Sequence, residues 1–422
     1  MPEYDVVIAG AGLAGSAAAI LLGRKGLKVA LLETHTHENS YKRLCTHVIR
    51  SSAVPTLRRL GIHSEIEDAG GVRTRDSLWT RHGWLRESPT PNRPNYGYNI
   101  RRETLDPIIR RVAAETPGVE LVLGAKVIGL TRSSDDRVDG VQFASRGTTH
   151  RVDSHLVVGA DGRHSRVACQ SDLPGKQYPN RRFTFFAQYR DVVVPDDQSL
   201  RVWLLEPDAA SISVHDDGVV VVAAMPDKER IGEFMSDREG ALCKTFIGLD
   251  SAPDLSSATR LSDVIGTRDY PMVLRRKIVR KGVALIGDAA MVTDPLIGAG
   301  CGWALQSAEW LADEVSSVLD GSGSTAGLDR ALFRYQLRHR WHLLPHQHAA
   351  IDFSHRREFS SVVDFLYRAA TRDPWIADQL FGVSTRNKSP LTLFTPRAMA
   401  RASLSNLGGF GDRHRNGTGK VR

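Results

Sequence analysis

The chain has 422 residues, of which 41% are hydrophobic and 25% are charged. A domain-sized core can therefore form, and collagen-like, low-complexity and wholly disordered chains are excluded. The formal net charge is +8, but the segment from Arg397 onward holds six Lys or Arg against one Asp, so the rest is nearly balanced. Because no basic stretch is interleaved with aromatic residues, we expect no nucleic-acid partner.

The cysteines and the N-terminal apolar stretch bear on the compartment. The four cysteines are widely spaced and contain no CxxC pair, which predicts reduced thiols, no structural zinc and a cytoplasmic location. The apolar stretch Val6–Leu22 follows acidic residues and is broken by glycines, so we expect no signal peptide. No other stretch approaches the length of a membrane span, and we expect no stable membrane insertion. The histidines between His339 and His348 lack an HExxH pattern, and we expect no bound metal.

The chain begins with a pattern typical of dinucleotide binding. The β-branched run Asp5–Ala9 predicts a buried parallel strand, and Ser16–Arg24 predicts a helix. Between them lies a GxGxxG sequence, Gly10–Gly15, and a second strand, Lys28–Glu33, ends on an acid. This order of strand, glycines, helix, strand and acid is far more specific than the glycines alone.

Each part of this pattern has a physical task. Gly10 permits a tight turn, Gly12 allows a pyrophosphate to approach the backbone, and Gly15 allows the helix to pack against the strand. The free N–H groups of the helix N-terminus face the phosphates. Glu33 would accept hydrogen bonds from a ribose diol and repel a 2′-phosphate, which favours FAD or NAD over NADP as the resident dinucleotide.

Two later segments return to a nucleotide-binding pattern. His155–Arg166 predicts a strand that ends in Asp161-Gly162 and leads into a helix. Gly282–Ala290 predicts a strand that ends in Gly287-Asp288, followed by a glycine cluster and a helix from about Trp303. A helix that begins beside a flavin would direct its positive end toward the anionic reduced ring.

In this order the three motifs resemble the class A flavoprotein monooxygenases, the fold group of p-hydroxybenzoate hydroxylase, over most of residues 5–320. The resemblance implies an α/β fold: an FAD-binding Rossmann-type, glutathione-reductase-like domain, an inserted antiparallel β-sheet substrate domain and a helical C-terminal region. It implies bound FAD and NADH or NADPH as a transient reductant. The expected reaction is O2-dependent hydroxylation or epoxidation of an aromatic or polyketide-like small molecule through a flavin C4a-hydroperoxide.

The resemblance also assigns site residues. Those expected to bind FAD are Gly10, Gly12, Leu13, Ala14, Gly15, Glu33, Thr34, Arg43, Arg102, Val127, Asp161, Gly162, Gly287, Asp288, Pro295, Gly298, Ala299, Gly300 and Cys301. Asp288 is alternatively a helix N-cap, and for Asp161 a cap or turn role has equal weight. Arg101 is as well placed as Arg102, and a solvated face is the alternative for each arginine.

Two residues are candidates for the chemistry itself. His47 lies in the loop after the second strand, where its imidazole could move a proton beside flavin or substrate. A structural histidine is the alternative and has somewhat more weight. Pro295 is expected to shape the loop beside the ring.

The expected domains are discontinuous. Residues 1–75, 100–175 and 270–320 form the FAD-binding domain, and 76–99 and 176–269 form the substrate-binding sheet. Residues 328–400 form a helical region, and 401–422 form a disordered basic tail. Short alternating strands place Phe185, Trp203 and Ile212 on the sheet, as pocket-lining residues or, with more weight, as ordinary core.

Three alternatives remain open at this point. A flavin halogenase would carry a WxWxIP sequence, which does not occur in this chain. A reductase of the geranylgeranyl type shares the three motifs but uses no oxygen. A non-catalytic FAD-binding protein would hold the cofactor without NAD(P)H turnover. The small-molecule substrate, the choice between NADH and NADPH and the oligomeric state are not readable from the sequence.

Overall fold

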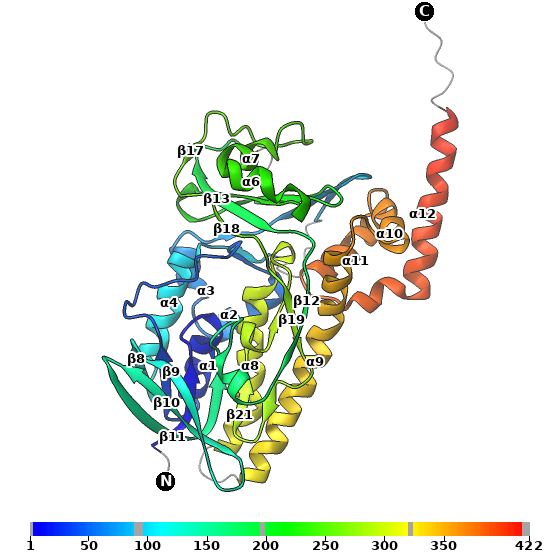
Figure 1. The fold of residues 1–422 in the computed structure, drawn as a ribbon. Coiled ribbons are helices and arrows are strands. Elements are labelled where there is room, and N and C mark those ends of the chain that lie inside the picture. The colour runs from blue at the N-terminus through cyan, green and yellow to red at the C-terminus, as the bar shows by residue number, and fades with distance from the viewer. Residues whose placement is uncertain (1–2, 88–95, 195–198, 320–323, 416–422) are drawn as a thin grey trace, which may run out of the picture. The chain divides into compact units, whose positions relative to one another are not determined.

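The computed structural model describes residues 3–87, 96–194, 199–319 and 324–415 (Figure 1). The chain divides into two compact units. Unit 1 comprises residues 1–71, 98–179 and 271–347, and unit 2 comprises residues 72–97, 180–270 and 348–422. Within the described ranges, no helix combines the length and the apolar character needed to cross a bilayer.

Unit 1 contains a mixed eight-stranded sheet in the order β20-β21-β11-β1-β2-β8, with β10 and β9 continuing from β11 as an antiparallel arm. Its strands are β1 (Tyr4–Ala9), β2 (Val29–Glu33), β8 (Val119–Leu123), β9 (Lys126–Arg132), β10 (Val138–Ser145), β11 (Thr148–Gly159), β20 (Val279–Arg280) and β21 (Val283–Leu285). Strands β21, β11, β1, β2 and β8 are parallel, so their carboxyl ends share one edge. Ligands bind beyond that edge in open α/β sheets.

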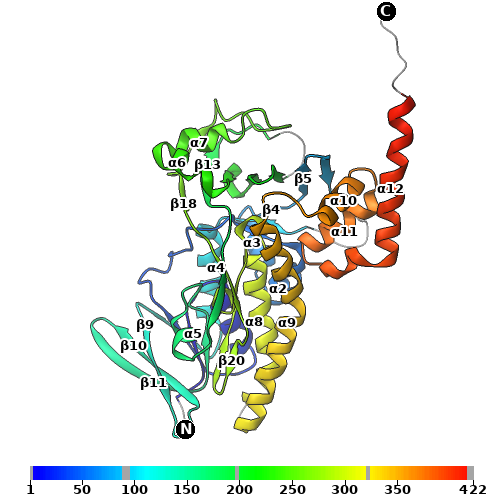
Figure 2. The ribbon, with the colours of Figure 1, turned by 45° about the vertical axis from the view of Figure 1, so that its right-hand side comes forward.

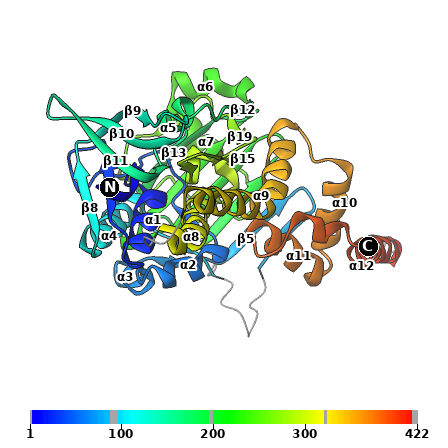
Figure 3. The same ribbon diagram turned by 90° about the horizontal axis from the view of Figure 1, so that it is seen from below.

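Helices cover this sheet. They are α1 (Leu13–Gly23), α2 (Val54–Arg59), α3 (His63–Asp68), α4 (Arg102–Glu115), α5 (Arg166–Gln170), α8 (Gly300–Leu319) and most of α9 (Thr325–His355). The α1 helix is buried along its whole length and lies beside α8 (Figures 1 and 3). The α9 helix packs along α8, where His342 stacks on Trp310 at 4.9 Å between ring centroids.

Short elements complete unit 1. They are β3 (Val48–Ile49), β7 (Tyr98–Asn99), β12 (Gly175–Tyr178), β19 (Met272–Arg275), β22 (Met291–Val292) and the 3₁₀ turns at Ser51–Ala53, Gly287–Ala289 and Pro295–Ile297. The fold class expected from the sequence is confirmed. The α8 helix begins at Gly300 instead of the expected Trp303, because Gly298 adopts a left-handed turn (φ +62°) and the helical bonds start directly after it.

Unit 2 is built on a second sheet in the order β17-β13-β16-β15-β14-β5-β6, with β18 beside β13. Its elements are β4 (Val72–Arg73), β5 (Asp76–Thr80), β6 (Gly83–Arg86), β13 (Thr184–Arg190), β14 (Leu200–Leu204), β15 (Ala209–Val214), β16 (Val220–Met225), α6 (Ile231–Ser236), α7 (Arg238–Lys244), β17 (Thr259–Arg260), β18 (Ile265–Thr267), α10 (Ser361–Ala370), α11 (Pro374–Ser384) and α12 (Pro396–Arg415), with 3₁₀ turns at Asp216–Gly218, Lys228–Arg230 and Pro390–Phe394. The α6 and α7 helices cover one face of this sheet (Figure 2).

The core under α6 and α7 agrees with the alternative that had more weight for three strand residues. Phe185, Trp203 and Ile212 are at most 2% exposed and pack with Phe234 of α6 and Leu242 of α7. These side chains form the core of unit 2 and do not line a substrate pocket. Alternation along a strand shows that a face is buried, but it does not distinguish a helix cover from a ligand.

A separate small core joins α10, α11 and α12 to the β5–β6 hairpin. Leu85 of the hairpin packs with Leu366 and Ile376, and Asp364 accepts hydrogen bonds from the Arg81 and His82 side chains. We expected a disordered tail from residue 401. The structure instead continues α12 through Arg415, and Arg401 in its first half pairs with Asp373 at 2.6 Å. Residues 416–422 of that tail lie outside the described residues.

Candidate functional site

The glycine turn between β1 and α1 has two positions where only glycine fits. Gly10 has φ +101°, and a Cβ there would lie 2.6 Å from the Ala160 carbonyl oxygen. A Cβ on Gly15 would lie 1.8 Å from the Gly10 carbonyl oxygen. A Cβ on Gly12, in contrast, would meet no atom within 4 Å. The turn is therefore tight at both ends and open in the middle, at the N-terminus of α1, where a phosphate can reach the backbone.

Glu33 is held against this turn. Its Oε2 accepts a hydrogen bond from the Ala11 N–H at 2.8 Å, and its Oε1 accepts one from the His35 N–H at 2.9 Å. The carboxylate is thus fixed at the carboxyl end of β2, next to the glycines, while Thr34 beside it is exposed. The Glu33 carbonyl accepts from the Ala125 N–H at 2.8 Å, which places the start of β9, with Val127, beside the same strand end.

Arg110 of α4 was not expected from the sequence. Its Nη1 donates to the carbonyl oxygens of Glu38 and Ser40, the latter at 2.8 Å, and its Nε donates to the Ala11 carbonyl at 3.3 Å. It ties the loop after β2 to the glycine turn. The available signal was its spacing, since Arg102, Asp106 and Arg110 share one helix face, but a pair of adjacent arginines is also typical of a solvated helix.

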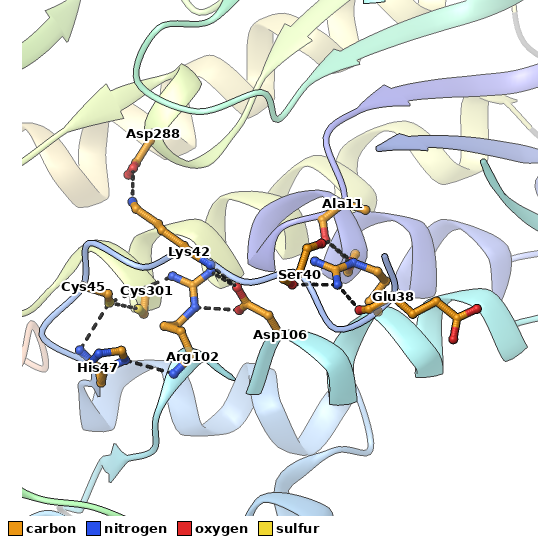
Figure 4. A network of polar contacts seen from close by, with 12 residues as sticks. Ala11, Glu38, Ser40, Lys42, Cys45, His47, Arg102, Asp106, Asp288 and Cys301 are labelled. Carbon is orange, nitrogen blue, oxygen red and sulfur yellow. Dashed lines mark hydrogen bonds and ion pairs between the residues drawn. The ribbon is translucent and has the colours of Figure 1, made fainter. Parts of the chain in front are cut away.

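Arg102 starts a second group of contacts on the same face of α4. Its Nε and Nη2 donate to the two carboxylate oxygens of Asp106 at 2.6 and 2.9 Å, and both side chains are buried. Asp106 also accepts from the Lys42 N–H at 3.0 Å, and the Lys42 ammonium pairs with Asp288 at 2.7 Å (Figure 4). Asp288 therefore lies in an ion pair. Arg43, the other expected arginine, is exposed.

His47 caps α4. Its Nδ1 accepts a hydrogen bond from the Arg102 backbone N–H at 2.9 Å, which requires a ring without a proton on Nδ1 (Figure 4). Burial, above all, lowers the pKa of His47 from its ordinary value of 6.5. His47 also has φ +60°, an uncommon conformation for a residue with a Cβ. The imidazole thus serves as a helix cap in the structure, in agreement with the structural alternative.

Cys45 and Cys301 meet at the edge of this group. Their Sγ atoms lie 3.7 Å apart, and the His47 N–H donates to Cys45 Sγ at 3.2 Å (Figure 4). Arg102 Nη1 lies 4.0 Å from Cys45 Sγ. Cys301 was expected from the resemblance, whereas Cys45 was not, because nothing in the local sequence indicates which distant residue it contacts.

The segment before α8 is shaped by a proline, a glycine and a buried arginine. Asp294 caps the turn that starts at Pro295, by accepting from the Leu296 N–H at 2.9 Å. Arg50 donates to the Ile297 carbonyl from Nε and Nη2, at 3.0 and 2.7 Å, and holds this turn. Ala299 is buried, and a Cβ on Gly300 would meet nothing within 4 Å.

The first turns of α1 and α8 come together at Gly287. A Cβ on Gly287 would lie 2.9 Å from Ala14 Cβ and 3.6 Å from Ala304 Cβ, and its N–H donates to Ser307 Oγ at 2.9 Å. The N-termini of α1 and α8, with the open positions Gly12 and Gly300, therefore lie on either side of the close contact at Gly287. The accessible backbone at these two positions fits a long molecule that carries a pyrophosphate near Gly12 and a flat ring near Gly300. FAD is such a molecule.

Asp161 belongs to another contact. Its carboxylate accepts from Ser165 Oγ and from the backbone N–H groups of Arg166 and Val167, the last two at 2.7 and 3.1 Å, and thus caps α5. Of its two expected roles, the structure shows the cap. Gly162 beside it has φ +80° and open space where a Cβ would be.

The comparisons with known proteins agree with this geometry. A family model described as "FAD binding domain" matches residues 3–337. The chain is 25% identical to "Digeranylgeranylglycerophospholipid reductase 1" of Methanococcoides burtonii over 80% of each chain. It is 28% identical to "Phenazine 1,6-dicarboxylic acid hydroxylase PhzS" of Lysobacter antibioticus, over 78% of this chain and 85% of the relative. The solved structure of the flavin-dependent brominase Bmp2 superposes with a TM-score of 0.78 at 18% identity, over 97% of this chain and 99% of the brominase.

Proposed function

Because the chain belongs to the FAD binding domain family and is an FAD-dependent oxidoreductase, we propose that it is a monooxygenase that uses NADH or NADPH and O2 to hydroxylate or epoxidise an aromatic or polyketide-like small molecule. The observation that supports this most directly is the pair of open glycines, Gly12 and Gly300, at two helix N-termini that converge on Gly287. A hydroxylase among the relatives supports oxygenation as the reaction type.

FAD, when bound, supplies electron transfer from the nicotinamide and the activation of O2. The residues that we propose contact it are Gly10, Gly12, Leu13, Ala14, Gly15, Glu33, Thr34, Arg43, Arg102, Val127, Asp161, Gly162, Gly287, Asp288, Pro295, Gly298, Ala299, Gly300 and Cys301. The glycine turn binds the pyrophosphate, and Glu33 accepts from the ribose. The N-terminus of α8 stabilises negative charge at the ring.

His47 and Pro295 act by positioning. His47 holds the start of α4, and with it Arg102, while Pro295 presets the turn whose carbonyl Arg50 binds. Asp288 pairs with Lys42, and because this ion pair is partly exposed, the carboxylate can exchange Lys42 for a hydroxyl of the cofactor.

The test is a product analysis under isotopically heavy oxygen gas. The FAD-loaded protein is mixed with NADH or NADPH and a panel of phenols, aromatic acids and polyketide-like aromatics, and parallel mixtures contain either a prenyl-chain lipid without oxygen, or added bromide and chloride. We expect oxygen uptake that rises with a substrate and one heavy oxygen atom in its product. Protein stripped of FAD is the control and should show neither effect.

Two other outcomes would overturn oxygenation. One is NAD(P)H oxidation that saturates a prenyl chain equally well without oxygen, as the reductase among the relatives suggests. The other is incorporation of bromide or chloride in place of oxygen, as the structural similarity to a brominase suggests. A protein that binds FAD but shows neither substrate-stimulated NAD(P)H oxidation nor a heavy-oxygen product with any member of the panel would contradict oxygenation of these substrate classes.

A further inference from the structure

Cys45 and Cys301 form a thiol pair in unit 1, although they lie 256 residues apart in the sequence. Cys45 lies in the loop between β2 and β3, and Cys301 is the second residue of α8, yet their Sγ atoms are 3.7 Å apart. A disulfide has an S–S length of about 2.05 Å, so closure requires an approach of about 1.6 Å, within the reach of side-chain rotation on an irregular loop. The other two cysteines lie elsewhere: Cys169 is exposed on α5, and Cys243 lies on α7 near the Tyr189 hydroxyl.

The surroundings of the pair favour one thiolate. The Cys45 sulfur accepts a hydrogen bond from the His47 N–H, and the Arg102 guanidinium lies 4.0 Å from this sulfur. Lys42 lies three residues before Cys45 in the sequence. The pKa of Cys45 lies well below its ordinary value, first because Cys301 donates a hydrogen bond to it, and then because of the nearby positive charge, against the effect of burial. Donation to Cys45, together with burial, raises the pKa of Cys301. Both shifts favour a thiolate on Cys45 and a thiol on Cys301.

We propose that Cys45 and Cys301 are a redox-active dithiol that hydrogen peroxide converts into a reversible intramolecular disulfide. The Cys45 thiolate attacks one peroxide oxygen, and the O–O bond breaks to leave a sulfenic acid and hydroxide. Cys301 sulfur then attacks the Cys45 sulfur, and the sulfenic oxygen leaves as water with the Cys301 proton. In total, two thiols lose two electrons, and one peroxide becomes two molecules of water once hydroxide is protonated.

A disulfide between Cys45 and Cys301 would link two parts of the candidate FAD site. It would fasten the loop that carries Lys42 and His47 to the first turn of α8, at the candidate FAD site. The thiol pair itself depends on the fold and on no particular reaction of the flavin. If the protein reduces a substrate without oxygenating it, the dithiol chemistry is unaffected, so the two proposals fail separately.

The experiment counts thiols in the denatured protein and maps cross-linked peptides. Reduced protein should show four thiols, brief treatment with a small excess of hydrogen peroxide should leave two, and dithiothreitol should restore four. Peptide mapping should find one link, between Cys45 and Cys301, within one chain. The oxidised protein should also melt at a higher temperature, because the link restricts the unfolded chain.

Variants separate this pair from general thiol oxidation. C45S and C301S should form no link, whereas C169S, which removes an exposed cysteine, should form it as the wild type does. Circular dichroism verifies the fold of each variant, and peptide mapping of the wild type tests the proposal without any variant. An unchanged thiol count, a link to a different cysteine, a link between chains or irreversible oxidation of Cys45 alone would each overturn it.

Discussion

The candidate site has two ends that are built differently. At the glycine turn, the walls are backbone atoms of the turn itself and of Ala160, and the Glu33 and Arg110 side chains hydrogen-bond to Ala11 within it. At the Arg102 end, the walls are side chains from three distant segments, including Asp106 and Asp288, joined by charge and hydrogen bonds. The first end depends on where a Cβ fits, and the second depends on whether buried polar groups keep their partners.

This difference separates two kinds of sensitivity. A backbone-walled site fails when any side chain is added, whatever its chemistry. A site walled by side chains fails when one partner of a buried pair is removed, even if its volume is preserved. Substitutions at the two ends should therefore differ in the size of their effect and in the property that they change.

The largest effects are expected at the glycine turn, and they should separate folding from binding. In G15A the new Cβ would lie 1.8 Å from a backbone oxygen, and we expect a loss of at least about 3 kcal/mol of stability. In G12A the Cβ meets no atom of the protein, so stability should change by less than about 0.5 kcal/mol. FAD affinity of G12A should fall about 100-fold, about 2.7 kcal/mol.

Chemical denaturation and FAD titration measure these two properties. If G12A and G15A lost stability equally, the turn would not be open at Gly12. If G12A bound FAD as tightly as the wild type, the pyrophosphate would not lie at this turn.

The next largest effect is expected at the buried ion pair of α4. R102M leaves the Asp106 carboxylate buried without its main partner, which should cost about 3–5 kcal/mol. R111M, on the same helix, removes exposed ion pairs with Glu65 and Glu115 and should cost less than about 1 kcal/mol. Urea unfolding of both variants makes the comparison, and equal losses would contradict the burial of the Arg102 pair.

A smaller and pH-dependent effect is expected at His47. H47A loses the cap of α4, which should cost about 1–2 kcal/mol, whereas the positive φ is present in both proteins. H47N should recover most of this, since Asn tolerates positive φ and its amide oxygen can accept from the Arg102 N–H.

The contribution of His47 to the stability of the wild-type protein should depend on pH. The unfolded imidazole takes up a proton near pH 6.5, whereas the folded one does so only at lower pH, so acidification favours unfolding. The stability advantage of wild type over H47A should be complete above pH 6.5 and shrink as pH falls through the lowered pKa of His47. Urea titrations at a series of pH values, with H47N as the variant that cannot titrate, would show a constant difference if the ring did not act as a neutral cap.

The smallest effect on stability is expected at the ion pair between Lys42 and Asp288, which is the more exposed part of the Arg102 end of the site. K42M breaks the ion pair with Asp288, whose side chains are 42% and 20% exposed, and stability should change by less than about 1 kcal/mol. K25M, at an exposed lysine after α1, is the control. FAD affinity of K42M should change less than tenfold and lose part of its salt dependence, as measured by titration at low and high salt. A large loss of stability would show that this pair is structural.

Much of the site was readable from the sequence where the determining contacts are local. Gly10, Gly15 and Glu33 lie within one βαβ unit, so their spacing along the chain already limits their spacing in space. The order of the three motifs indicated the family and the fold class, because each motif is itself a short local pattern and their sequence along the chain resembles that of a known family. Val127 followed from the resemblance, and the structure places its strand beside Glu33.

Other features were decided only by the tertiary structure. The sequence could not show that Cys45 meets Cys301, that His47 caps a helix 55 residues later, or that Arg110 binds the glycine turn. It also could not show whether Trp203 faces a ligand or two covering helices. A local pattern determines which backbone shapes are possible, whereas the partner of a side chain depends on how distant elements pack, and that packing is set by the whole core.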